Sequence, residues 1–189
     1  MARADVTSRR RGAAPTKRPA KLPTKRRLAN IAAFYLKRFS SSAENLRRVL
    51  RRRVLTMTLE RPELRAEAQR AVDEVVAALI AAGALDDARY AAGRVRVDQA
   101  LKKPRAKTAA KLRAKGVARP VIAAALDAEA DADADFRAGL AIARRRRLGP
   151  FRTGARSRET DRRDLGVLAR AGLDFATAKR VMAADPDEA

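Results

Sequence analysis

A phrase of 15 residues occurs twice in the second half of the chain, and this repetition constrains the fold more than any other feature. Residues 112–126 read LRAKGVARPVIAAAL, and residues 168–182 read LARAGLDFATAKRVM. Alignment of the two copies places Gly116 on Gly172, 56 residues apart. Chains that repeat a small helical unit stack their units and present an extended surface, rather than one deep pocket, to a large partner.

Apolar residues at helical spacing predict three such units, each made of three helices. We therefore predict an all-α fold in which three tandem three-helix repeats stack into an elongated body that can curve. The repeats are expected at residues 28–84, 85–130 and 131–189. Phe175 lies on the apolar stripe of the last helix. Residues 1–27 contain three prolines and no apolar period, so we expect a disordered basic arm there.

The second unit has a clear beginning in the sequence. Gly83 is expected to end the preceding helix. Asp86 is a good N-cap, and Leu85 just before it can pack against Tyr90 one turn later. We therefore interpret the Asp86–Asp87 pair as a helix start that complements the helix dipole, and not as part of a metal site.

The chain carries a large positive charge, with 44 Lys and Arg against 22 Asp and Glu, a net charge of +22. The first 27 residues hold ten basic side chains and one acid, so the rest still has 34 basic against 21 acidic side chains. A body of this sign attracts polyanions through an interaction that weakens as salt concentration rises. We expect a nucleic acid or a nucleoprotein surface as the partner, and solubility alone is the alternative explanation.

The chain contains no Cys and no His. This composition excludes disulfides and Cys nucleophiles, and it removes the commonest general base and transition-metal ligand. We therefore expect a non-enzymatic protein without cofactor or metal. The N-terminal residues lack the apolar segment of a signal peptide, and the longest apolar run, residues 75–85, is shorter than the roughly 18 residues of a membrane span. A cytoplasmic location and no membrane partner are expected.

Two phrases of the central unit resemble the RecX family, bacterial regulators of the RecA recombinase. GALDDARY begins at Gly83, and LRAKGV begins 29 positions later. The resemblance covers about residues 28–184. It implies a protein, expected here as a monomer, that lies in the groove of a RecA–DNA filament and inhibits recombination, ATP hydrolysis and co-protease function in DNA repair and the SOS response. The motif and repeat residues are Gly83, Leu85, Asp86, Asp87, Arg89, Tyr90, Leu112, Gly116, Val117, Leu168 and Gly172.

The chain departs from the usual pattern of that family in its central unit. Members usually carry an aromatic or aliphatic residue at the position of Arg94 and a basic residue at the position of Asp98. They also have a glycine-containing turn where this chain has residues 102–105, KKPR. Arg94 therefore falls on the expected apolar face, so either the helix rotates slightly or the side chain extends to its edge. The departures concern the mode of RecA regulation more than the fold.

Basic residues of the second and third units are candidate contacts for an acidic RecA surface, or for the phosphates of single-stranded or double-stranded DNA. A merely solvated face explains each single residue as well as a contact does. Four successive arginines sweep about 300° around a helix, so residues 144–147 cannot share one face. The candidates are Arg94, Arg96, Lys102, Lys103, Arg105, Lys107, Lys111, Arg113, Lys115, Arg144, Arg145, Arg146, Arg147, Arg152, Arg156 and Arg158.

Two other functions stay open. Three-helix units also resemble helix-turn-helix domains, but the chain has only two Asn and two Gln for base reading, which favours sequence-independent, nucleoid-type DNA binding without RecA. A metal-dependent nuclease would need a cluster of acids, yet Phe136 and Ile142 stand where a calcium loop needs Gly and Glu. The acids in question are Asp127, Glu129, Asp131, Asp133 and Asp135.

Overall fold

The computed structural model describes residues 22–186 and confirms the all-α fold, because this range contains helices and turns but no strand. None of its helices is both long and apolar enough to cross a membrane. Residues 1–21 of the expected basic arm lie outside the described residues, and α1 begins at Lys25 rather than at residue 28, since Thr24 caps its N-terminus. The helices are α1 (Lys25–Leu36), α2 (Ala43–Met57), α3 (Arg65–Ala81), α4 (Asp87–Ala100), α5 (Arg105–Ala114), α6 (Arg119–Ala128), α7 (Ala134–Arg146), α8 (Arg158–Ala171) and α9 (Phe175–Met182).

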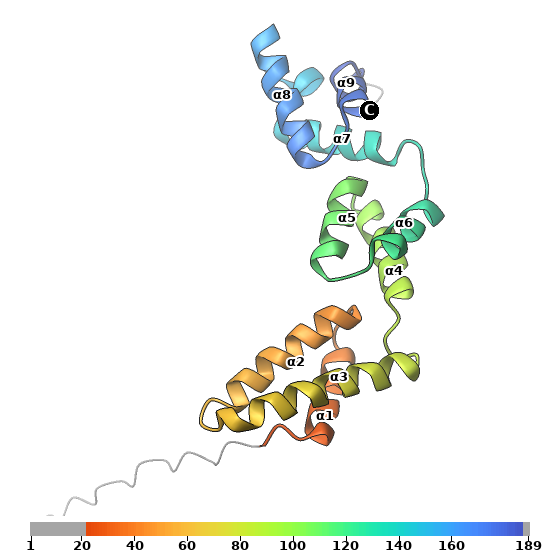
Figure 1. Cartoon of the computed structure of the whole chain (residues 1–189). Coiled ribbons are helices and arrows are strands. Elements are labelled where there is room, and N and C mark those ends of the chain that lie inside the picture. Colours follow the sequence, from red (N-terminus) through yellow and green to blue (C-terminus); the bar gives the residue numbers. More distant parts are fainter. Residues whose placement is uncertain (1–21, 187–189) are drawn as a thin grey trace, which may run out of the picture.

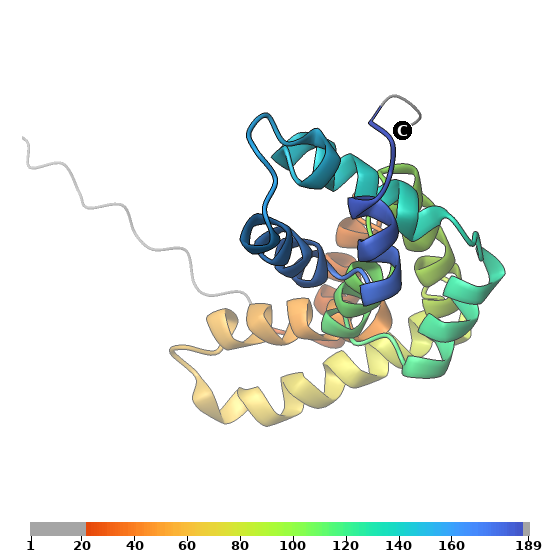
Figure 2. The ribbon, with the colours of Figure 1, turned by 90° about the horizontal axis from the view of Figure 1, so that it is seen from above.

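Three groups of three helices are stacked along one direction, from α1–α3 through α4–α6 to α7–α9 (Figure 1). The view along the stack shows that the groups overlap around a common axis (Figure 2). Each group buries its own small core, in which Leu46, Leu112 and Leu168 of the middle helices are fully buried. The molecule is therefore a chain of small domains and not one continuous core.

Two apolar side chains differ from the sequence-based expectation. Leu85 belongs to the core of the first unit, whereas Tyr90 packs against the core of the second. Leu85 thus closes the first unit instead of opening the second. Phe175 is 68% exposed, because it stands at the first position of the eight-residue α9, whose buried face is made by later residues.

The repeated phrase forms the same turn in both copies. Gly116 follows α5 with a φ of 79°, and Gly172 ends α8 with a φ of 102°, in the left-handed region that favours glycine. The next N–H in each copy donates to the carbonyl of Leu112, at 3.1 Å, or of Leu168, at 3.2 Å. These bonds pair carbonyls that the helix end would leave without a donor. The hydrogen bonds therefore support the alignment of the two copies.

The first and second units meet where the N-terminus of α2 faces the C-terminus of α5. Ser42, the N-cap of α2, is fully buried, and its hydroxyl donates to the carbonyl of Lys115. The N–H of Ala43 donates to the Asp87 carboxylate at 2.8 Å. The positive end of one helix therefore faces the negative end of another, and the polar groups of both ends are paired.

The second and third units repeat this arrangement. The first N–H of α5, that of Arg105, donates to the carboxylate of Asp135 at 2.8 Å, so an acid from the first turn of α7 again caps the middle helix of the preceding unit. The C-terminus of α8 lies against the first turn of α5, since a Cβ on Gly172 would be 3.4 Å from that of Ala106. The helices α8, α5 and α2 therefore follow one another end to end with the same polarity.

We call the contact between the first and second units the first joint, and we expect Gly116→Ala to destabilise it. A Cβ at this position would lie 2.4 Å from Cγ of Glu44 and 2.5 Å from its Cβ, in a left-handed backbone conformation that costs alanine about 1–2 kcal/mol by itself. The combined loss should exceed about 2 kcal/mol in urea unfolding followed by circular dichroism. Gly93→Ala is the control, because a Cβ there meets nothing within 4 Å, and equal losses in both variants would contradict the prediction.

Candidate functional site

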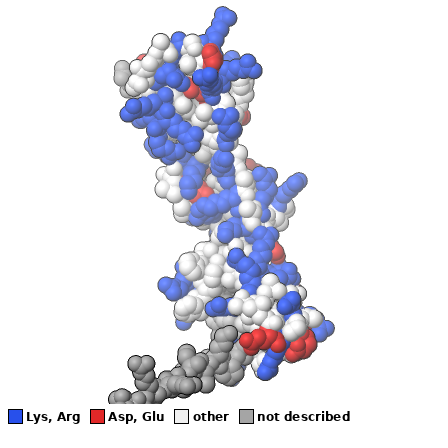
Figure 3. Space-filling model, turned by 90° about the vertical axis from the view of Figure 1, so that its left-hand side faces the viewer, with Lys and Arg blue, Asp and Glu red and all other residues white. Residues whose placement is uncertain are grey.

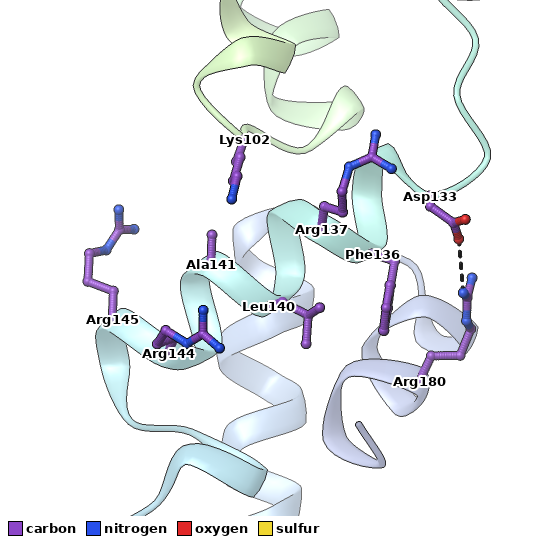
Figure 4. A pocket seen from close by; sticks show the side chains of 9 residues that line it. All are labelled: Lys102, Asp133, Phe136, Arg137, Leu140, Ala141, Arg144, Arg145 and Arg180. Carbon is purple, nitrogen blue, oxygen red and sulfur yellow. Dashed lines mark hydrogen bonds and ion pairs between the residues drawn. The ribbon is translucent and has the colours of Figure 1, made fainter. Parts of the chain in front are cut away.

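A basic groove lies where the second unit meets the third. Two adjoining hollows of about 710 and 400 Å³ share Lys102, Ala141 and Arg145, so we treat them as one site, the joint groove. Figure 4 shows the larger hollow, with Lys102 pointing from the turn after α4 toward α7. The Lys and Arg residues of the joint groove are Lys102, Lys103, Lys107, Arg137, Arg144, Arg145, Arg146, Arg170 and Arg180.

The joint groove has a strong excess of positive charge. Among the residues that line the groove, one is an acid, Asp133. Arg180 pairs with Asp133 at 3.0 Å, and the Arg180 guanidinium lies 4.5 Å from the centre of the Phe136 ring. On the face seen in Figure 3, Lys and Arg cover much of the second and third units, and the most conspicuous acids lie near the lower end. A partner for this surface must therefore carry an extended negative charge.

Lys102 enters the joint groove because the chain turns sharply after α4. Its φ is 50°, a left-handed conformation, and the N–H of Lys103 donates to the carbonyl of Asp98 at 2.9 Å. This is a helix-ending turn that glycine usually occupies, and Pro104 follows it as a stop signal. The turn at residues 102–105 therefore keeps the shape of a glycine turn while it carries a cationic side chain.

We expect Lys102→Gly to stabilise the protein and to weaken the binding of an anionic partner in the joint groove. Glycine removes the left-handed strain, which is worth about 1 kcal/mol, but it also removes a groove cation. Urea unfolding measures the stability, and the affinity for the RecA–DNA filament that the family resemblance implies measures the binding. Lys102→Gln is the control, since it loses the charge and keeps the strain, and the prediction is wrong if the two variants are equally stable.

Asp98 organises the base of this turn. Its carboxylate is 1% exposed and contacts Nζ of Lys103 at 2.9 Å, Nε of Arg94 at 3.3 Å and Nζ of Lys111 at 3.7 Å. A buried carboxylate is tolerated when cations compensate its lost hydration, and here three do so. The departures at Arg94, Asp98 and the turn therefore form one network, in which Arg94 is half-buried and extends from the apolar face to the acid.

Several predicted candidates lie outside the joint groove and stabilise the fold instead. Arg152 donates to both carboxylate oxygens of the buried Asp164, at 2.7 and 2.8 Å. Lys115 donates to Asn45 across the first joint at 3.0 Å. Sequence alone does not separate such residues from exposed ones, because their partners are distant along the chain. The candidates outside the groove are Arg94, Arg96, Arg105, Lys111, Arg113, Lys115, Arg147, Arg152, Arg156 and Arg158.

Three groove residues escaped the sequence-based prediction. Arg137, Arg170 and Arg180 lie on α7, α8 and α9 outside the dense basic runs, and each resembles an ordinary solvated position. One signal was present for Arg137, which precedes Arg144 and Arg145 by seven and eight residues and so shares a face of α7 with them. The other two are brought into the site only by the packing of the third unit.

The five acids of the nuclease alternative are used in structural contacts. Arg137 donates to Asp131 and, together with the N–H of Asp133, holds the pKa of the Asp131 carboxyl below its ordinary value. Within residues 22–186, no three potential ligands lie close enough together to hold a metal ion. The pairs are Asp127 with Arg105, Glu129 with Arg96, Asp131 with Arg137, Asp133 with Arg180, and Asp135 with the N–H of Arg105. This arrangement argues against the nuclease alternative.

Comparisons with known proteins agree on one family. A family model described as RecX, second three-helix domain, matches residues 86–126. The chain is 40% identical over 172 residues to Regulatory protein RecX of Myxococcus xanthus (strain DK1622). The aligned residues cover 90% of this chain and 91% of the relative. The crystal structure of RecX from Lactobacillus salivarius superposes with a TM-score of 0.64 at 18% identity, over 84% of this chain and 94% of that one. A crystal structure of regulatory protein RecX gives a TM-score of 0.65 at 18% identity, over 85% and 72% of the two chains.

Proposed function

The chain belongs to the RecX family, and we propose that it binds RecA–DNA filaments and inhibits the recombinase, ATPase and co-protease activities of RecA. In this proposal the protein acts as a cytoplasmic monomer and catalyses no reaction itself. The observation that carries the proposal is the joint groove, which lies between two units of an elongated molecule and is lined by nine basic side chains. A polyanionic filament offers the matching surface.

The arrangement of units supports a bridging mode of action. Each unit has its own core, and neighbouring units are joined through polar contacts at helix ends. The units can therefore contact successive RecA protomers or neighbouring phosphates as separate modules. A molecule attached at several points resists the exchange of protomers, because all contacts must open together.

Pelleting with RecA filaments tests the proposal. RecA is assembled on single-stranded DNA with ATP, the protein is added, and its amount in the pellet is measured while ATP hydrolysis is followed. We expect RecA-dependent recovery in the pellet and slower ATP hydrolysis, with both effects weakening as salt rises. Recovery that does not depend on RecA, together with unchanged hydrolysis, would contradict the proposal.

Sequence-independent DNA binding without RecA is the second candidate. The lining of the joint groove favours phosphate contacts over base reading, because it contains many Lys and Arg but no Asn or Gln. Under this alternative, the affinity for naked duplex DNA equals the affinity for the filament. Under the proposal, the filament binds more tightly at the same salt concentration.

A further inference from the structure

A second track crosses the first and second units, away from the joint groove. It consists of two adjoining hollows of about 350 and 450 Å³, and Arg38 and Phe39 line both. The first hollow lies between α1 and α2, and the second continues to α4. We call it the aromatic track, because aromatic and arginine side chains make up most of its functional lining. These side chains are Phe34, Tyr35, Phe39, Tyr90, Arg38, Arg52, Arg53, Arg89 and Arg94.

The aromatic side chains of the track are concentrated, and its two phenylalanines are open to solvent. The whole chain has two Tyr, five Phe and no Trp, so four of its seven aromatic residues line this track. Phe34 is 64% exposed and Phe39 is 54% exposed, and neither packs against the core of the first unit. The Tyr35 ring holds Phe39 in place, with 5.2 Å between the ring centres. Exposed aromatic groups of this kind mark a binding surface.

The charges of the track select an anionic occupant. Five arginines line it, and its lining contains neither Asp nor Glu. In the part of the chain that the structure describes, Arg38, Arg52 and Arg53 take part in no ion pair, in contrast to Arg47, which lies on α2 and pairs with two acids. The guanidinium of Arg38 lies 5.7 Å from the centre of the Phe34 ring. The net charge of +22 disfavours a second copy of this chain as the occupant.

We propose that the aromatic track binds single-stranded nucleic acid, with bases stacked on Phe34 and Phe39 and phosphates held by Arg38, Arg52 and Arg53. Open aromatic rings between arginines along a groove are the features that single-strand binding sites share. An acidic protein helix fits less well, because the second hollow offers Gly93, Ser40 and arginines rather than a continuous aliphatic floor. Paired bases in a duplex cannot reach the rings, so the site distinguishes single strands from duplexes.

The two tyrosines of the chain provide a direct readout. Tyr35 and Tyr90 both line the track, and no Trp masks their fluorescence. The protein alone is titrated with a thymidine strand of about 12 nucleotides, a length typical of single-strand sites, and with an abasic strand of equal length. We expect the thymidine strand to bind at least about fivefold more tightly and to quench the tyrosine emission, because only it can stack.

Substitution of the rings tests the site itself. In the double variant Phe34→Leu, Phe39→Leu, the affinity for the thymidine strand should fall by about 5- to 100-fold, while the affinity for the abasic strand stays unchanged. Phe175→Leu is the control, because Phe175 is 68% exposed beneath Lys179, and its helix α9 lies at the other end of the stack from α1 and α2 (Figure 1). Circular dichroism melting verifies that all variants are folded.

Two results would overturn the inference. One is equal binding of the thymidine and abasic strands without quenching. The other is a double variant that binds the thymidine strand like the wild type but no longer pellets with RecA filaments, which would indicate a protein-docking surface instead. Since the titration contains no RecA, a negative result here leaves the proposed filament binding unaffected.

Discussion

Reversal of four charges in the joint groove should reduce filament binding by at least about 100-fold at low salt. The variant carries Lys102→Glu, Lys107→Glu, Arg145→Glu and Arg146→Glu, four positions that line the groove from both units. Each reversal replaces attraction to an anionic surface with repulsion, so four contacts together account for several kcal/mol. Pelleting with RecA filaments over a range of salt concentrations measures the loss, and the salt dependence should become shallower because fewer counterions are released.

A matched control separates local contacts from net charge. Arg26, Arg61, Arg70 and Arg119 are exposed and lie outside the groove, so their reversal to Glu changes the net charge by the same amount. We expect this control to weaken binding by less than about tenfold, through long-range attraction alone. If both variants lose the same affinity, the joint groove is not the contact surface.

Removal of the buried carboxylate in Asp98→Ala should destabilise the protein by about 2–3 kcal/mol. The acid is 1% exposed and holds three cations, so its loss leaves them to repel one another around an empty site. The cost stays below that of a fully buried pair, because Lys103 and Lys111 are each 41% exposed and can turn toward water. Urea unfolding followed by circular dichroism measures the change.

Asp161→Ala is the control for this prediction. Asp161 pairs with Arg156 at 3.1 Å, but both side chains are about 40% exposed, so we expect a loss of less than about 0.5 kcal/mol. The Asp98 variant should also lose filament affinity, since the Asp98 carboxylate holds Lys103 in the turn that presents Lys102. An Asp98 variant as stable as the Asp161 variant would show that the network does not support the turn.

Local features of the fold were predictable from the sequence because their causes lie within a few residues. Asp86 caps α4 by accepting the N–H of Arg89 at 2.9 Å, as its position before an apolar period predicts. The left-handed glycines end their helices, since few other residues adopt that conformation without strain. The joints were not predictable. Asp87 caps a helix that begins 44 residues earlier, and no local pattern signals that contact.

The sequence-based candidates and the lining of the joint groove overlap in part. The dense basic runs include Lys102, Lys107 and Arg145, and the structure places these three in one hollow although they lie in different units. The same reasoning included Arg152, which is committed to the buried Asp164. It also missed Arg180, since the two cations of the short α9, Lys179 and Arg180, form no dense basic run.

The sequence by itself determined that this chain forms repeated three-helix units with a basic surface, because helical period, capping residues and net charge are local or additive properties. Only the tertiary structure decided which cations are free to meet a partner. The tertiary structure buries Asp98 in contact with Arg94, Lys103 and Lys111. It also aligns α8, α5 and α2 end to end, so that the second and third units form the joint groove. The physical reason is that the exposure and pairing of a charge depend on residues far away in the chain, which the fold brings within a few ångströms.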